Sequence, residues 1–193
     1  IAQVAACAGF QATMVDIKQE YVDKGLAAIE RSLGKLVAKE RMSEQDAALA
    51  LARVSISTDK SAVADSDLVV EAIPEIPDLK FSTFAELDGI CKPSTILASN
   101  TSSISINEIA AATSRPERVI GMHFMNPVPI MKLVEIINGS ETASEVSDAV
   151  VAAAEKMGKV ALCCNDSPAS SQTDFSARCS MRQYLPCRMG SQR

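Results

Sequence analysis

The chain has 193 residues, of which 47% are hydrophobic, and it carries a formal net charge of −5. This composition can build the core of one domain, or of one domain and part of another. The acidic balance and an aromatic content of 4% argue against a nucleic-acid partner, and no apolar run approaches the roughly 18 residues that cross a bilayer, which argues against a membrane partner.

The first part of the chain predicts helices and strands in alternation. The opening stretch IAQVAACAGF is rich in alanine, which favours a helix, and Gly9 suits a left-handed cap. Residues 11–16 predict a short buried strand that ends at Asp16. A long helix follows, whose apolar face is marked at steps of three and four residues by Val22, Leu26, Ile29, Leu33 and Leu36. Ser43, with Asp46 three residues on, predicts the N-cap of another helix.

The rest of the chain continues the alternation. Strands are expected at 54–58, 67–73, 95–99, 118–124, 132–137 and 159–164, and helices at 77–90, 105–112 and 143–157. This order predicts an α/β fold with a doubly wound sheet, in which ligands bind beyond the carboxyl ends of the strands. Polar residues follow four of the strands at Asp16, at Glu75, in SNTSS (99–103) and at His123 with Asn126.

The stretch GMHFMNPVPIMKLVEII contains the only histidine, His123, and a glutamate, Glu135, in an otherwise apolar strand. A buried carboxylate without a partner is costly, so Glu135 needs one. A carboxylate on one ring nitrogen fixes the tautomer of an imidazole and raises its basicity. The pair is therefore a candidate general base with its orienting acid. The alternative is a structural histidine and a glutamate paired with a lysine.

The start of the chain contains part of a dinucleotide-binding motif. Such a motif has a glycine-rich turn, a helix that faces the pyrophosphate, a strand, and an acid that binds the ribose hydroxyls. The last three parts are present, with Asp16 in the position of the acid. An acid there disfavours a 2′-phosphate and so favours NAD over NADP. We expect the chain to begin after the glycine turn; the alternative is an ordinary helix-to-strand connection capped by Asp16.

Three blocks in order, VVEAIPE…DLK, ILASNTSSISI and RVIGMHFMNPVPIMKLVEII, resemble the NAD-binding domain of the 3-hydroxyacyl-CoA dehydrogenases, in particular the 3-hydroxybutyryl-CoA dehydrogenase branch. The resemblance covers residues 1–168 and implies a Rossmann-like, mostly parallel sheet that lacks its first strand. It implies NAD-dependent oxidation of a short (S)-3-hydroxyacyl-CoA to the 3-ketoacyl-CoA, or the reverse. It also implies a homodimer formed through a C-terminal helical domain that this chain does not include. The alternative is a non-catalytic remnant that binds nucleotides or CoA weakly.

The resemblance also assigns the residues of the reaction. His123 would take the proton of the substrate's 3-hydroxyl, Glu135 would hold the imidazole, and Ser102 would hydrogen-bond the substrate oxygen. The positions that match cofactor contacts are Asp16, Glu75, Lys80, Asn100 and Asn126. For Ser102 the alternative is a helix cap or turn, and for Lys80 it is a solvated helix face.

The long helix carries a basic stripe away from its apolar face, formed by Lys24, Arg31, Lys35 and Lys39. Ser32 and Lys39 match family positions that lie against the phosphorylated nucleotide of CoA. Phosphates require such donors. The alternative is an ordinary solvated face.

Residues 169–193 depart from the family, because a pattern like GFIVNR is replaced by a stretch without helix or strand periodicity. With one base restored after Pro168, codons permitted for ASSQTDFSARCSMRQYLPC can be read as GIVTNRLLSPMLNEAIFAL, which is family-like. We therefore infer a frameshift, expect a disordered non-family tail, and expect the chain itself to be inactive. The alternative is a genuine variable tail.

The six cysteines include no CxxC pair, so the sequence predicts neither a zinc site nor a disulfide framework, and no metal is expected. A reducing compartment is favoured. We expect a soluble intracellular protein of the cytoplasm, peroxisome or mitochondrion.

Overall fold

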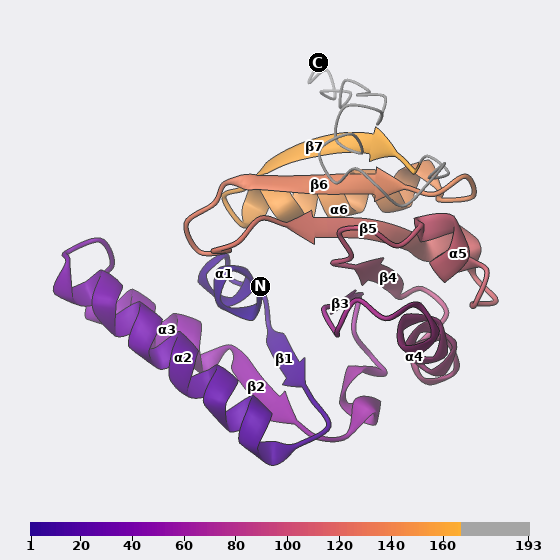
Figure 1. Cartoon of the computed structure of the whole chain (residues 1–193). Helices are drawn as coiled ribbons and strands as arrows, with labels where there is room; N and C mark the ends of the chain where they lie inside the picture. Colours follow the sequence, from indigo (N-terminus) through magenta and orange to yellow (C-terminus); the bar gives the residue numbers. More distant parts are fainter. Residues whose placement is uncertain (167–193) are drawn as a thin grey trace.

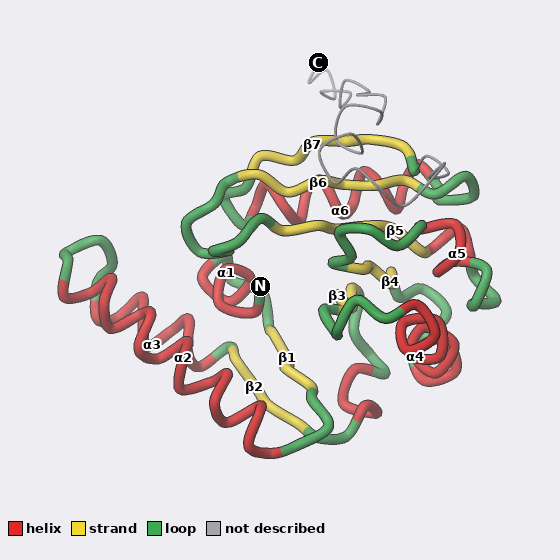
Figure 2. The backbone as a smooth tube through the Cα atoms, viewed as in Figure 1, coloured by secondary structure: helices red, strands yellow, loops and turns green. Residues whose placement is uncertain are grey.

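Helices and strands alternate throughout the computed structural model, which describes residues 1–166 (Figures 1 and 2). The helices are α1 (Ala2–Cys7), α2 (Gln19–Ala38), α3 (Glu44–Ala52), α4 (Pro77–Ile90), α5 (Ile106–Ala110) and α6 (Ser144–Lys156). The strands are β1 (Ala12–Val15), β2 (Val54–Ser57), β3 (Leu68–Glu71), β4 (Ile96–Ser99), β5 (Val119–Phe124), β6 (Leu133–Asn138) and β7 (Val160–Asn165). Each predicted element is present, and two short 3₁₀ turns, Lys60–Val63 and Pro116–Arg118, were not predicted.

The strands form two sheets, a parallel pair β1-β2 and a five-stranded sheet in the order β3-β4-β5-β6-β7. Every neighbouring pair is parallel except β5 and β6, which are antiparallel. Within the described residues β1 and β3 have no ladder between them, and Figure 1 shows them facing each other at the break between the sheets. The prediction of a Rossmann-like, mostly parallel sheet is confirmed, and the break lies where the resemblance implied that a strand is lacking.

Local sequence signals explain the ends of several elements. Ser43 caps α3, its hydroxyl accepting the backbone N–H of Asp46 at 3.0 Å. Gly9, after α1, has a φ of +91°, a conformation that side chains disfavour. The predicted strand 67–73 ends early, at Glu71, because the Glu71 carboxylate accepts the Ile73 N–H at 2.6 Å and turns the chain.

The core lies on both faces of the five-stranded sheet. On one face, under α4 and α5, apolar side chains including Phe84 and Val119 are buried; on the other, under α6, Ile120 and Val150 are buried (Figure 1). Neighbouring residues of β5 thus enter opposite cores, as the strand period of two requires. Fully burying one such side chain contributes about 1.5–3 kcal/mol. This packing fixes the strand ends that carry the polar residues.

Within residues 1–166, no helix has the length and apolar character needed to cross a membrane. The predicted tail, 169–193, lies outside the described residues.

Candidate active site

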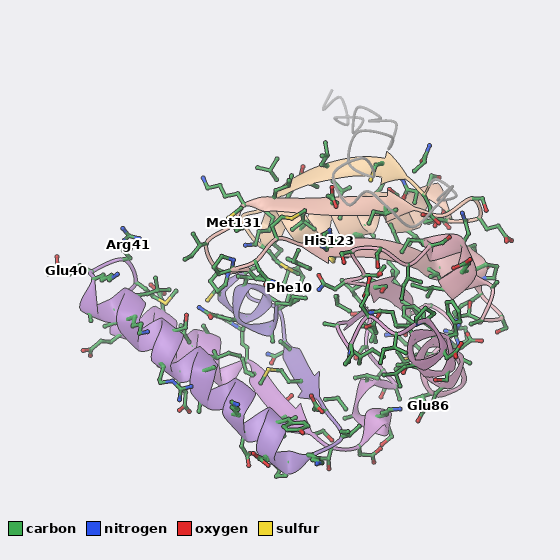
Figure 3. The ribbon with its side chains drawn as sticks, in the orientation of Figure 1. Phe10, Glu40, Arg41, Glu86, His123 and Met131 are labelled. Atoms are coloured by element: carbon green, nitrogen blue, oxygen red, sulfur yellow. The ribbon has the colours of Figure 1, made fainter. Side chains whose placement is uncertain are left out.

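His123 and Glu135 face each other across the antiparallel strands β5 and β6. The imidazole Nδ1 lies 2.8 Å from the Glu135 Oε2, and the side chains are 15% and 7% exposed. The predicted contact is therefore present, and the strand register explains it, since the antiparallel pairing of β5 with β6 places His123 opposite Glu135. Figure 3 shows where His123 lies on the ribbon. Because its Nδ1 is engaged by the carboxylate, a proton exchanged with a ligand would use Nε2.

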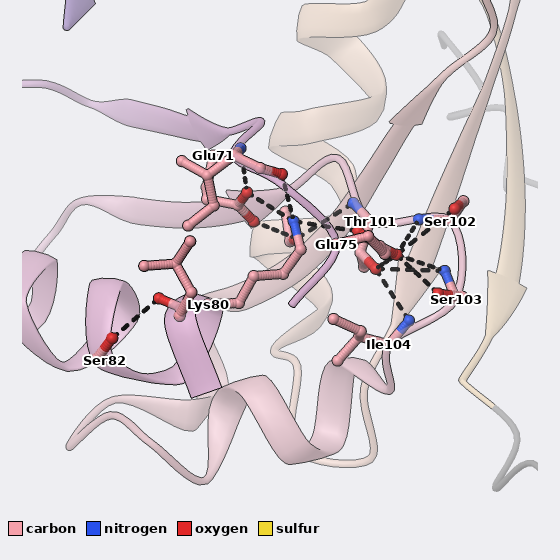
Figure 4. A network of polar contacts seen from close by, with 11 residues as sticks. Glu71, Glu75, Lys80, Ser82, Thr101, Ser102, Ser103 and Ile104 are labelled. Atoms are coloured by element: carbon pink, nitrogen blue, oxygen red, sulfur yellow. Dashed lines mark hydrogen bonds and ion pairs between the residues drawn. The ribbon is translucent and has the colours of Figure 1, made fainter. Parts of the chain in front are cut away.

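Glu75 organises the segment Asn100–Ser103, which follows β4 (Figure 4). Its Oε1 accepts the Ser102 N–H at 3.0 Å and the Ser103 N–H at 2.9 Å, together with the hydroxyls of Thr101 and Ser103. Burial raises the pKa of Glu75, but the hydrogen bonds from Thr101 and Ser103 and the charge of Lys80 outweigh it and lower the pKa to about 2. Glu75 is therefore a carboxylate at neutral pH.

Lys80 lies in the first turns of α4 with a side chain that is 1% exposed. Its Nζ lies 2.7 Å from the Glu71 Oε1, 3.2 Å from the Ile73 carbonyl oxygen and 3.3 Å from the Glu75 Oε2. The alternative of a solvated helix face is therefore wrong. The reason is the buried Glu71, which sequence reasoning missed although an acid in an apolar strand was the signal that drew attention to Glu135.

The two asparagines occupy the same edge of the five-stranded sheet. Asn100 follows β4, and its Oδ1 accepts the Phe124 N–H at 2.9 Å, which joins the end of β4 to that of β5. Asn126 is exposed beyond β5. β3 and β4 end in register, with Glu71 paired to Ser99, while β5 continues to Phe124 beyond Gly121, the residue paired to Ser99. The structure thus brings the asparagines, the serine segment and the histidine to one edge.

The remaining predicted residues lie elsewhere. Asp16 directly follows β1 in the other sheet. It is exposed, and its Oδ1 accepts the Ile17 N–H at 2.7 Å. Ser32 lies on α2 and is half-buried, and Lys39 is the exposed residue that caps the C-terminal end of that helix. Lys39 is next to Glu40, which Figure 3 shows at the tip of the α2–α3 hairpin, far from His123.

These positions fit a dinucleotide. The exposed Asp16 carboxylate stands at a strand end, where it can accept ribose hydroxyls, and the amide of Asn100 stands at the carboxyl edge next to the histidine strand. The chain has no glycine before Gly9, so its described residues supply no glycine turn ahead of α1. Among residues 1–166, no cluster of three or more histidine, cysteine, aspartate or glutamate side chains could hold a metal ion.

Comparison with protein-family models finds one described as "3-hydroxyacyl-CoA dehydrogenase, NAD binding domain", which matches residues 1–167. The chain belongs to the 3-hydroxyacyl-CoA dehydrogenase family. The family resemblance seen in the sequence is confirmed, and an NAD-binding domain agrees with the prediction of NAD as the cofactor.

Curated relatives of this 3-hydroxyacyl-CoA dehydrogenase domain include two probable 3-hydroxybutyryl-CoA dehydrogenases. The one from Deinococcus radiodurans is 51% identical over 168 residues, and the one from Bacillus subtilis is 49% identical over 168 residues. Both alignments cover 87% of this chain, and 60% and 58% of those proteins, so the chain spans less than two thirds of their length. The crystal structure of (S)-3-hydroxybutyryl-CoA dehydrogenase from Ralstonia eutropha matches with a TM-score of 0.85 and 46% identity, over 86% of this chain and 59% of that one.

Proposed function

We propose that this domain serves an enzyme that oxidises a short (S)-3-hydroxyacyl-CoA to the 3-ketoacyl-CoA with NAD, or catalyses the reverse reduction. The observation that carries the proposal is the pair of His123 and Glu135 at the carboxyl edge of the sheet, 2.8 Å apart. Oxidation of an alcohol must remove a proton from the hydroxyl and a hydride from its carbon. The protein supplies the base for the first, and NAD, when bound, accepts the second.

The histidine acts in this scheme through Nε2. With Nδ1 held by the Glu135 carboxylate, Nε2 accepts the hydroxyl proton, and the carboxylate stabilises the imidazolium that forms. Both side chains are largely shielded from solvent, which strengthens this interaction. Ser102, in the segment organised by Glu75, donates a hydrogen bond to the substrate oxygen.

The remaining residues are assigned to binding of the cofactor and of CoA. Asp16 binds the adenosine ribose and favours NAD over NADP, while Glu75, Asn100 and Asn126 line the cofactor side of the edge that carries the histidine. Ser32 on α2 and Lys39 at the C-terminal end of that helix contact the nucleotide of CoA, and a homodimer forms through a C-terminal helical domain. The proposed partner is thus an acyl-CoA, with neither nucleic acid nor membrane.

A second candidate function is that of a non-catalytic remnant with weak nucleotide or CoA binding. The observation that favours it is the break between the two sheets. In the described residues β1 and β3 have no ladder between them, and backbone groups at such edges are left for water or another segment.

A graft separates the two candidates. We define the extended enzyme as the Bacillus subtilis relative, 49% identical, with its matching region replaced by residues 1–167 of this chain. The proposed function predicts NADH formation from (S)-3-hydroxybutyryl-CoA and NAD at a rate well above that of the same graft carrying His123→Gln. A folded extended enzyme without such turnover would favour the remnant.

A further inference from the structure

Glu71 and Ser99 are buried polar residues to which the proposed reaction assigns no role. They are 5% and 0% exposed and lie at the paired ends of β3 and β4. The Ser99 hydroxyl donates to the Glu71 Oε2 at 2.6 Å, while the Glu71 Oε1 accepts from the Ile73 N–H and the Lys80 Nζ. Every oxygen of this carboxylate therefore has a partner inside the protein.

From Glu71 a short route leads along the backbone to the segment Asn100–Ser103. The Ser99 hydroxyl, held by Glu71, accepts the N–H of Thr101 at 3.2 Å. This contact fixes the chain direction immediately after β4. Rotation of the Ser99 hydroxyl away from Glu71 would remove both bonds together.

A second route passes through charged side chains (Figure 4). Glu71 holds the Lys80 ammonium at 2.7 Å, and the same ammonium lies 3.3 Å from the Glu75 Oε2. Glu75 in turn accepts the backbone N–H groups of Ser102 and Ser103. Both routes end in the segment Asn100–Ser103. The position of the Glu71 carboxylate therefore affects that segment through two independent sets of contacts.

Stability does not explain this arrangement. A lysine in the first turns of a helix opposes the helix dipole, and burying an ion pair costs free energy that well-packed apolar side chains would not incur. Replacing such pairs with apolar residues is often neutral or stabilising. In some proteins buried ionic groups fix a conformation, and the backbone that this network contacts is that of the serine segment.

We propose that Glu71 and Ser99 are positioning residues that set the conformation of Asn100–Ser103, with Lys80 and Glu75 as the relay. The Lys80 ammonium group, which contacts the Glu71 carboxylate, the Ile73 carbonyl and the Glu75 carboxylate, connects Glu71 to Glu75. The link to catalysis rests on the proposed function, because it requires Ser102 to contact substrate. The link to the conformation of the segment does not.

Amide hydrogen exchange on the 193-residue chain tests the conformational part. In Glu71→Gln, the amides of Ser102 and Ser103 should exchange at least about 10-fold faster, while those of the core strand β5 change far less, as in local opening. The matched control is Glu86→Gln, which removes an ion pair with Lys60 from the exposed face of α4, the helix that carries Lys80. This control should leave the serine amides unchanged.

Two results would overturn the proposal. One is unchanged exchange at Ser102 and Ser103 in Glu71→Gln. The other is faster exchange that keeps step with β5, which marks a general loss of stability. If Glu71→Gln does not fold, Ser99→Ala decides, because it removes one hydroxyl without disturbing the charges. The Thr101 amide should then exchange about 10-fold faster than in the parent, and an unchanged rate would refute the backbone route.

The catalytic part is tested in the extended enzyme. Glu71→Gln should lower kcat about 10-fold with the KM for NAD within about 2-fold, the pattern for a group that acts on the transition state. A fall in kcat/KM that comes only from a higher KM, with kcat unchanged, would contradict this part of the proposal. If the extended enzyme shows no turnover in any form, the proposed function fails, and the exchange measurements still decide the network.

Discussion

The Nδ1 of His123 lies 2.8 Å from the Oε2 of Glu135, across the one antiparallel pair of strands in the five-stranded sheet. An antiparallel return aligns residues close in sequence, so the base and its orienting acid are placed by a single strand register. A shift of one residue would turn Glu135 to the other face of the sheet. The geometry is thus as rigid as the sheet itself.

In the extended enzyme, His123→Gln should reduce kcat by at least about 100-fold, the usual contribution of general base catalysis. Affinity for NAD should stay within about 2-fold, because the change spares the cofactor contacts proposed above. Steady-state kinetics and NAD titration provide both values. Glu135→Gln is the companion variant, which should lower kcat while the protein still melts cooperatively. Near-normal turnover of the His123 variant would refute the assignment.

Asp16→Ala should narrow the preference for NAD over NADP. The parent disfavours NADP because a carboxylate near the ribose hydroxyls repels a phosphate dianion. The ratio of kcat/KM for the two cofactors measures this directly in the extended enzyme. Asp65→Ala, which removes an exposed carboxylate before β3, is the control and should leave the ratio unchanged. An unchanged ratio in Asp16→Ala would place the ribose acid elsewhere.

Glu75 should make the free energy of unfolding depend on pH in the acidic range. Its pKa falls from 4.5 to about 2 on folding, so as the pH drops the unfolded chain takes up the proton first. The contribution of Glu75 to the free energy of unfolding is complete above pH 4.5 and is lost as the pH falls from there toward about 2. Since each unit of pKa difference corresponds to about 1.4 kcal/mol, Glu75 can contribute at most about 3 kcal/mol to the free energy of unfolding. Screening of this side chain, which is 34% exposed, reduces it to about 1–2 kcal/mol.

Urea denaturation of the parent and of Glu75→Gln, at a series of pH values, checks this. Other carboxylates titrate alike in both proteins, so their difference in the free energy of unfolding isolates Glu75. That difference should be largest near neutral pH and shrink below pH 4.5. A difference that is constant with pH would show that Glu75 keeps an ordinary pKa.

Gly121 marks a close approach between β5 and β6. A Cβ built there would lie 2.8 Å from the Ile137 Cβ, an atom that cannot move without its backbone. Gly121→Ala should therefore destabilise the protein by about 1–3 kcal/mol through overpacking. The control is Gly34→Ala on α2, where a Cβ would meet nothing within 4 Å, and which should gain up to about 1 kcal/mol from helix propensity. Equal thermal melts for the two variants would contradict the expected difference.

Apolar periodicity and turn residues predicted the helices and strands well, because these signals are local. The ion network at the end of β3 escaped prediction for a physical reason. Glu71 looks like one acid among several, and its partners Lys80 and Ser99 are defined only when helix α4 and strand β4 pack beside it. Lys80 was for the same reason open to interpretation as a solvated residue. Burial of a charge depends on long-range packing, which one-dimensional patterns do not encode.

The 193-residue chain by itself should show no NAD-dependent turnover of (S)-3-hydroxybutyryl-CoA, whereas the extended enzyme should show it. The histidine pair and the serine segment are both formed in residues 1–166, so the chemistry is not what fails. What the described residues do not provide is continuity between β1, which Asp16 follows, and β3, which leads to Glu75, because no ladder joins these strands. The proposed ribose and nicotinamide contacts thus stand on separate sheets.

A bound dinucleotide must contact both sheets. The free energy needed to hold the two sheets in a fixed arrangement reduces the net affinity for the dinucleotide. We therefore expect weak NAD binding by the chain, measured by calorimetry, and at least about 100-fold tighter binding by the extended enzyme, in which a continuous sheet would pre-organise the site. His123→Gln in the 193-residue chain is the control for residual activity, which should be indistinguishable from background in both. Turnover by the chain alone that disappears with this substitution would show that the two sheets already hold the cofactor.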